Sequence, residues 1–365
     1  AFLTVYWFAM DQPESAVKAA ENLVVEQLPA VVGTEVAWAL AAITADAGQV
    51  ADAVGLADAG YAAATRSLDA PQMRFNIADA HVSALLLAGR IAEALEVAEQ
   101  AGRQAADLPG AAQLRGAAVR GRAALGAGRV DLAGALLGRA AEGLSSSGHA
   151  GGWGYRYGIP CATALALGGA TTEATAMLTE RDKLRRPFRA LDYERALARA
   201  WVAAGQGAVS EAVDVVVSAA EKARSVGQFA AEVLCLQTAT QFGDSTGVSR
   251  LRELEAIVEG PRVRLAARFA VGLRDGRRAH EREGAARLRR GEFHGARPLA
   301  RHHVGQEAVL QLLRGVAVQR LHRTQREHGA ELEGDVGRAP HLLDGCGEEV
   351  RQALPAVLRR GDDVA

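Results

Sequence analysis

Four neighbouring residues, Trp153, Tyr155, Arg156 and Tyr157, form the cluster in this chain that most resembles a binding site. They lie within residues 145–158, a stretch rich in serine and glycine that predicts a long loop. Aromatic rings on a loop between helices can line a surface for a protein partner. The same rings can instead fill a gap between neighbouring helices, and we favour this packing role because Trp and Tyr are usually mostly buried. The four residues are therefore a candidate partner-binding loop, with packing as the alternative.

The sequence contains no motif for catalysis. None of Lys18, Lys183 and Lys222 is preceded by the glycines of a phosphate-binding loop. The chain also has no His-Glu-x-x-His zinc motif, no Cys-x-x-Cys pair and no Gly-x-Ser-x-Gly nucleophile elbow. We therefore predict that the chain is not an enzyme and has no catalytic, cofactor-binding or metal-binding residues.

Residues 276–365 differ in composition from the rest of the chain. They hold 16 Arg, 13 Asp or Glu and seven of the nine His, and they contain no Lys, Ile, Ser, Tyr or Trp. His294, His302 and His303 are close in sequence, but their spacing matches no zinc pattern and no Cys lies nearby. The arginines could bind nucleic acid, yet acids are interspersed with them and Phe293 is the only ring available for stacking on bases. We favour a charged, solvated tail over both kinds of site.

The composition of the whole chain sets limits on its class. With 42 basic and 43 acidic residues the net charge is −1, which gives no obvious field for nucleic acid or an anionic membrane. Three widely spaced cysteines fit buried thiols in a reducing compartment. The apolar residues 1–10 are too few to span a bilayer and have no basic flank. We predict a cytoplasmic protein that does not bind membranes, and, since the chain begins with Ala1 inside an expected helix, a fragment of a longer one.

One glycine-centred turn recurs along the chain and must position any site. It reads AGQVADA at residues 47–53, AGRIAEA at 88–94 and AGRVDLA at 127–133, with looser copies later. The glycines, spaced 36 to 41 residues apart, are Gly48, Gly89, Gly128, Gly169, Gly207 and Gly243. A period of this length indicates a repeat array. Each glycine is expected to take the left-handed conformation that ends one helix. The residue five positions later, alanine in all but the last copy, is expected where the two helices cross.

The fold class that follows is all-α. Two short helices are expected in residues 1–30, then about six antiparallel hairpins stacked as a tetratricopeptide-like solenoid over residues 1–275. The turn period stops near Asp275, and residues 276–365 are expected to form a separate, partly helical or disordered Arg/His-rich tail. A shifted reading frame in GC-rich DNA would also give such a run.

Two stretches carry a resemblance to a known family. They are ARAWVAAGQGAVSEA at residues 198–212 and AAEKARSVGQFAAEVLCLQTATQFG at 219–243, the latter continuing to AIVEGPRV at 256–263. Together they resemble the helical-repeat region of large LuxR-family, MalT-like transcriptional regulators. In that family an ATPase module precedes the repeats and a helix-turn-helix domain follows them.

The resemblance implies a regulatory scaffold that binds a protein partner or a small-molecule effector. ATP and Mg²⁺ are expected only in the ATPase module, and DNA contact only in the helix-turn-helix domain; neither part is found in this chain. The alternative is a stand-alone repeat adaptor that mediates protein–protein interaction without a role in transcription.

Overall fold

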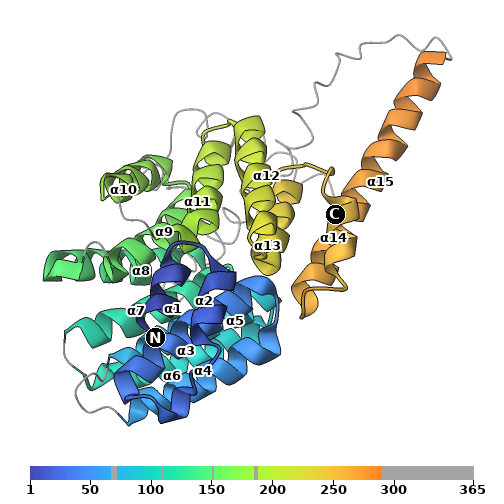
Figure 1. Cartoon of the computed structure of the whole chain (residues 1–365). Coiled ribbons are helices and arrows are strands. Elements are labelled where there is room, and N and C mark those ends of the chain that lie inside the picture. The colour runs from blue at the N-terminus through green and yellow to red at the C-terminus, as the bar shows by residue number, and fades with distance from the viewer. Residues whose placement is uncertain (67–71, 109, 150–151, 185–187, 290–365) are drawn as a thin grey trace, which may run out of the picture. The chain divides into compact units, whose positions relative to one another are not determined.

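A computed structural model describes residues 1–66, 72–108, 110–149, 152–184 and 188–289, with side chains described as far as Gly276. Within these residues every regular element is helical, so the predicted all-α class is confirmed. The α-helices are α1 (Phe2–Ala9), α2 (Pro13–Ala20), α3 (Ala30–Ala47), α4 (Val50–Thr65), α5 (Met73–Ala88), α6 (Ile91–Ala106), α7 (Ala111–Gly126), α8 (Val130–Leu144), α9 (Trp153–Leu167), α10 (Thr171–Lys183), α11 (Asp192–Gly205), α12 (Val209–Ser225), α13 (Phe229–Gln241), α14 (Val248–Leu254) and α15 (Pro261–Arg289) (Figure 1). Short helical turns, η1 (Val25–Gln27), η2 (Ser145–His149) and η3 (Arg189–Leu191), lie between them.

The six predicted glycine turns all have the left-handed conformation. Their φ angles lie between 72° and 93°, a region that an L-residue with a Cβ rarely adopts. At the first turn the amide of Gly48 donates to Ala45 O at 3.0 Å, and that of Gln49 donates to Thr44 O at 3.0 Å. These hydrogen bonds satisfy the last carbonyls of α3 and end it. The prediction that these glycines are left-handed and end a helix is therefore confirmed.

The position five residues after each glycine is buried, as predicted. The side chains are Ala53, Ala94, Ala133, Ala174, Ala212 and Val248. The five alanines are fully buried and Val248 is 2% exposed. A small residue at this place lets the second helix of each hairpin lie close to the first.

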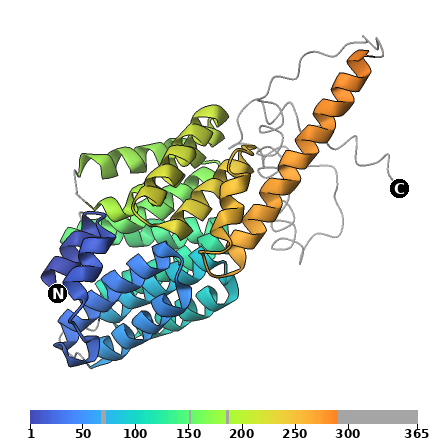
Figure 2. The same ribbon diagram turned by 45° about the vertical axis from the view of Figure 1, so that its right-hand side comes forward.

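The helices form two layers. Each helix from α3 to α13 packs against the next one in sequence (Figures 1 and 2). The odd-numbered helices α3, α5, α7, α9, α11 and α13 also pack successively against one another, and we call these the inner helices. The even-numbered helices α4 to α12 pack mainly against the inner helices before and after them.

The last hairpin packs back on the first two. Helix α13 contacts α3 and α5, and α15 contacts α5. The amide of Glu259 donates to Gly48 O at 2.9 Å, and the guanidinium of Arg262 donates to Leu86 O at 2.8 and 3.0 Å. As a result α5 is enclosed, and twelve of its 16 residues are buried, including polar ones. The turn period did not predict this return contact.

The predicted loop at residues 153–157 is wrong, since these residues are the first turns of α9. Serine and glycine do form the turn η2 just before it. The glycines inside α9 serve close packing instead: a Cβ on Gly158 would lie 2.6 Å from Arg181 Nε on α10. Glycine content misled the prediction because it reflected helix contact as well as turn formation.

The predicted domain boundary at Asp275 falls inside a helix. Helix α15 continues from Pro261 to Arg289 across that position. The tail sites weighed at His294, His302 and His303 lie outside the described residues.

Candidate functional site

The structure brings three of the four predicted site residues together in one pocket. Trp153, Tyr155 and Arg156 line it from the N-terminal turns of α9. Tyr157 lies behind Trp153, with ring centroids 5.6 Å apart, and is fully buried. Tyr155 and Arg156 are also buried, while Trp153 is half-buried. Packing of these side chains is evident; whether they bind a partner stays a prediction.

We call this cavity the aromatic pocket. Its volume is about 200 Å³, and its lining also includes Glu35 and Trp38 of α3, Asn76 of α5, and Phe188. The ring of Trp38 lies 5.9 Å from that of Trp153 and is stacked at 6.3 Å against that of Phe188. Offset and edge-on ring pairs at these separations are mutually stabilising. The rings therefore form a preorganised apolar wall.

Arg156 connects the pocket to a buried ion cluster. Its Nε donates to Asp79 Oδ2 at 2.6 Å, and Arg122 Nε lies 3.4 Å from Asp79 Oδ1. Arg122 also donates from both terminal nitrogens to the carboxylate of Glu194, at 3.3 Å each. We call these four residues the interior ion cluster. They come from four successive inner helices, α5, α7, α9 and α11.

The carboxyl groups of the interior ion cluster raise the pKa of both of its arginines. Burial opposes the charged form of Arg122, but the carboxylates of Glu194 and Asp79 outweigh it, and the pKa of Arg122 rises. The pKa of Arg156 rises for the same reason, with Asp79 as the main partner. Both guanidinium groups therefore stay charged inside the protein.

Asp46 and Tyr193 form a neighbouring buried pair. The hydroxyl of Tyr193 donates to Asp46 Oδ1 at 3.1 Å. Burial raises the pKa of Asp46 to about 8, although the hydrogen bond from Tyr193 opposes that rise. At pH 7 this carboxyl is therefore mostly protonated and adds little negative charge to the interior.

Arg115 is the least compensated charge in this region. It is 6% exposed, donates to Asn76 Oδ1 at 3.0 Å, and lies over the ring of Trp153 at 5.1 Å. Its Nε is buried with no hydrogen-bond partner among the described residues. Burial lowers the pKa of Arg115, and only Tyr157 opposes this effect. Together with the interior ion cluster, the region therefore holds three guanidinium groups and two paired carboxyl groups, those of Asp79 and Glu194.

A second cavity is lined by two other members of the interior ion cluster. Its volume is about 260 Å³, and its lining includes Arg122, Glu194, Trp201 and Arg262. Burial lowers the pKa of Arg262, whose guanidinium also donates to Gln237 Oε1 at 2.8 Å. Two cavities are thus each lined by members of the interior ion cluster.

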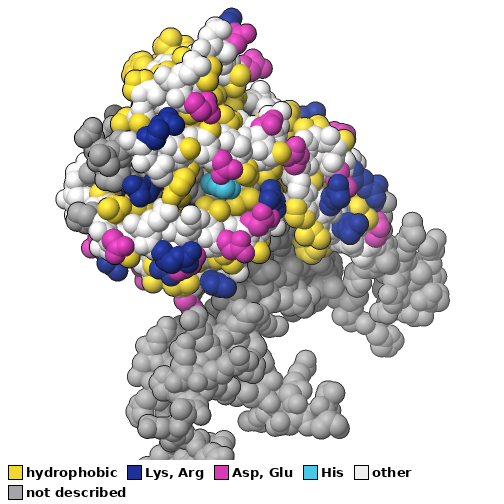
Figure 3. Space-filling view, turned by 90° about the horizontal axis from the view of Figure 1, so that it is seen from below, with side chains coloured by type: hydrophobic (Ala, Val, Ile, Leu, Met, Phe, Trp, Pro, Cys, Tyr) yellow, Lys and Arg dark blue, Asp and Glu magenta, His cyan; other side chains and the backbone are white. Residues whose placement is uncertain are grey.

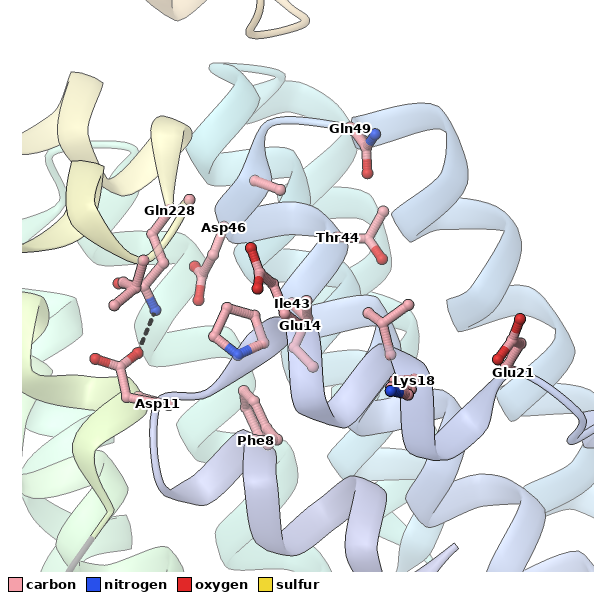
Figure 4. A pocket seen from close by; sticks show the side chains of 16 residues that line it. Phe8, Asp11, Glu14, Lys18, Glu21, Ile43, Thr44, Asp46, Gln49 and Gln228 are labelled. Carbon is pink, nitrogen blue, oxygen red and sulfur yellow. Dashed lines mark hydrogen bonds between the residues drawn. The ribbon is translucent and has the colours of Figure 1, made fainter.

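A third cavity, of about 640 Å³, has mainly acidic side chains among its ionisable lining residues, and we call it the acidic cavity (Figure 4). It lies between α2, α3 and the turn before α13. Its ionisable lining residues are Asp11, Glu14, Lys18, Glu21 and Asp46. Asp11 accepts a hydrogen bond from Gln228 Nε2 at 3.0 Å, which links the N-terminal helices to α13. Burial raises the pKa of Asp11 against the opposing effect of Lys222.

Two of the cysteines are buried free thiols, as predicted. Burial raises the pKa of Cys161 to about 11 and that of Cys235 to about 12. Both thiols are therefore protonated near neutral pH, which makes them poor nucleophiles. Within the described residues no group of three His, Cys, Asp or Glu is arranged to hold a metal ion.

Comparison of the chain with family models, curated proteins and solved structures finds no match. The site is therefore interpreted from its own geometry.

The sequence interpretation missed most of the residues around Arg156. These are Trp38, Asn76, Asp79, Arg122, Phe188 and Glu194. A signal was available for Asn76 and Asp79: both interrupt an apolar run at helical spacing, so they lie on a face that must be buried. A polar residue there needs a buried partner.

Proposed function

We propose that the hairpins of residues 1–275 are a tetratricopeptide-like solenoid. The regular turn period, the two-helix unit and the successive contacts among inner helices support this. The return contact of α13 and α15 on α3 and α5 distinguishes this array from an extended one, in which a repeat contacts only its neighbours.

We propose that this solenoid is the regulatory ligand- or protein-binding scaffold of a LuxR-family, MalT-like transcriptional regulator. The two stretches that carry the resemblance form α11 to α13. One observation supports a role in sensing a ligand. Arg156 lines the aromatic pocket and also belongs to the interior ion cluster, whose members come from four inner helices. A ligand that contacts Arg156 acts on the packing of all four, and such differential contact is what couples a site to a conformational change.

Other activities belong to other parts of such a regulator. ATP with Mg²⁺ would bind the ATPase module, and DNA the helix-turn-helix domain. The present chain would be non-catalytic and cytoplasmic. On the face seen in Figure 3, acidic and basic side chains are interspersed, which suits protein contact better than a nucleic-acid backbone.

One described helix, α3, is long and apolar enough to cross a membrane. Half of the residues of α3 are buried, and the helix packs against α1, α4, α5 and α13. The core helix of a protein that does not cross a membrane can be equally long and apolar. We therefore assign α3 to the core of the scaffold.

The DNA that flanks the coding region tests this proposal. We expect an in-frame phosphate-binding loop upstream and a helix-turn-helix downstream, in the same frame or after a frame correction. If neither is encoded, the regulator assignment is wrong. Inspection of the other frames across residues 276–365 tests the frameshift hypothesis in the same experiment.

A stand-alone adaptor is the second candidate. Phe2, Leu3 and Tyr6 of α1 are 80%, 55% and 44% exposed. Exposed apolar side chains gathered on one short helix favour contact with a protein. Flanking DNA without regulatory modules would favour this function.

A further inference from the structure

We propose that the aromatic pocket binds a small anionic ligand: a carboxylate joined to one flat apolar ring. This inference rests on the proposal that the scaffold binds a ligand, and it specifies the charge and shape of that ligand. The carboxylate would contact Arg156, and the ring would lie among Trp38, Trp153 and Phe188.

The polar groups that line the pocket are mainly hydrogen-bond donors. Arg156 is 8% exposed, and its one hydrogen bond within the described residues uses Nε, so its terminal nitrogens are unpartnered. Trp38 Nε1 is also buried without a partner in that part of the chain. Asn76 has its oxygen occupied by Arg115, and its Nδ2 makes only a 3.6 Å contact to Met73 Sδ. Among these donors only Trp38 Nε1 is buried without a partner in the described part of the chain, and the terminal nitrogens of Arg156 are the charged donors that a carboxylate would accept from.

The number of basic and acidic groups near the pocket also favours an anionic ligand. The interior ion cluster with Arg115 holds three guanidinium groups but only two carboxyl groups, those of Asp79 and Glu194. Arg115 contacts the pocket through Asn76 and through the ring of Trp153 rather than through a carboxylate. A buried charge without a counter-ion is unfavourable, so a bound anion would complete the cluster.

The size of the pocket limits the ligand. Sites for drug-sized molecules have volumes of about 300–1,000 Å³. A cavity of about 200 Å³ suits a single ring with a short acidic group. Ring stacking on Trp38 and Trp153 would supply the apolar part of the affinity.

A cation is the opposite candidate, because aromatic walls with a carboxylate at the rim can bind ammonium groups. Glu35 is that carboxylate, and its side chain is exposed. However, a cation in this pocket would meet the guanidinium of Arg156, and the ring of Trp153 already faces that of Arg115. Like charges at this depth repel strongly, so an anion is favoured.

The test uses the full chain at pH 7 and three matched probes: phenylacetate, phenylacetamide and phenethylamine. Binding is measured by calorimetry and by tryptophan fluorescence. We expect phenylacetate to bind at least about tenfold more tightly than phenylacetamide, and phenethylamine to bind most weakly. Equal affinity for acid and amide overturns the inference. So does a folded protein that does not bind phenylacetate at millimolar concentration.

Two variants locate the binding. Arg156→Gln is expected to abolish the preference for the acid over the amide. Because it also removes a partner of Asp79, circular dichroism must show that the variant is folded. Glu35→Gln leaves the interior unchanged and removes an exposed carboxylate at the rim. It should lower the Kd of phenylacetate about two- to threefold and leave that of phenylacetamide unchanged.

Glu14→Gln is the matched control, since it makes the same charge change at an exposed position of the acidic cavity. It should leave the Kd of phenylacetate unaltered. If both glutamate variants change the Kd equally, the effect comes from net charge and the pocket assignment is wrong. If phenylacetamide binds and phenylacetate does not, the anionic ligand is wrong but the ligand-binding scaffold stands. If the flanking DNA encodes no regulatory modules, the regulator assignment is wrong but the anionic ligand stands.

Discussion

Asp79 lies fully buried between two guanidinium groups, 2.6 Å from Arg156 Nε and 3.4 Å from Arg122 Nε. Its carboxylate is a counter-ion for both arginines and offsets the cost of burying their charges. Removing one member of a buried ion cluster leaves uncompensated charge, which costs more than the pairing itself contributes.

We therefore expect Asp79→Asn to lower the free energy of unfolding by about 3–5 kcal/mol, measured by chemical denaturation. Asp182→Asn is the matched control, because Asp182 also pairs with two arginines, at 2.6 and 2.7 Å, but is partly exposed. Its cost should stay below about 1 kcal/mol, since solvent screens the pair. Similar losses in the two variants would contradict the special role of the buried cluster.

Asp46 predicts a pH dependence of stability. Its pKa of about 8 in the folded protein lies above the usual value of 3.8, so the folded state retains a proton that the unfolded state releases. The stability from this group is fully present below pH 4 and is lost as the pH rises towards 8. The expected slope is about −1 kcal/mol per pH unit between pH 5 and 7.

Asp46→Asn removes the titrating proton and should flatten this slope. Unfolding measured at several pH values gives the difference between the two proteins directly. The variant should match the parent below about pH 4 and exceed it by a growing margin as the pH rises to 8. Parallel pH profiles would show that Asp46 does not titrate in this range.

At the scale of the helices, the hairpin crossing depends on a small side chain. Ala94 is fully buried where α6 packs against its neighbours, whereas Ala92 on the same helix is exposed. Ala94→Leu should overpack the crossing and cost about 1–3 kcal/mol of unfolding free energy. Ala92→Leu adds the same atoms on the solvent side and should change stability by less than about 0.5 kcal/mol. A melting temperature of Ala94→Leu equal to that of Ala92→Leu would refute this placement.

The helix ends were predictable because the turn signal is local. Gly48 and its five counterparts need a positive φ whatever the rest of the chain does, so their spacing sufficed to place the hairpins. The start of α9 was not predictable in the same way. There, Gly158 permits contact with Arg181 of the next helix, and a sequence alone does not separate that use of glycine from a turn.

The site was less predictable because its members lie on different repeats. Asp79, Arg122 and Glu194 each lie on a mainly apolar inner helix, and each finds its partner on another inner helix. Each residue alone could be a solvated surface charge. Only the packing of the inner helices shows that one polar residue from each meets the others.

At the scale of the whole repeat array, the return of the last hairpin to the first can be tested at two equivalent glycines. Gly48 and Gly207 have φ of 91° and 86°, so alanine is equally strained at both. A Cβ on Gly48 would lie 2.9 Å from Val258 Cγ2, whereas a Cβ on Gly207 would meet nothing within 4 Å. Any difference between the two substitutions therefore reports the contact between the first turn and the segment after α14.

Gly207→Ala should cost about 1–2 kcal/mol, the usual penalty of the left-handed conformation. Gly48→Ala should cost at least about 1 kcal/mol more, because Val258 and the hydrogen bond from Glu259 to Gly48 O must shift. In a double-mutant cycle, Val258→Ala should remove part of that excess, since it deletes Cγ1 and Cγ2 but leaves the Cα of residue 258 at 3.1 Å. Equal costs at the two glycines, measured by denaturation, would mean that the sixth hairpin does not rest on the first in solution.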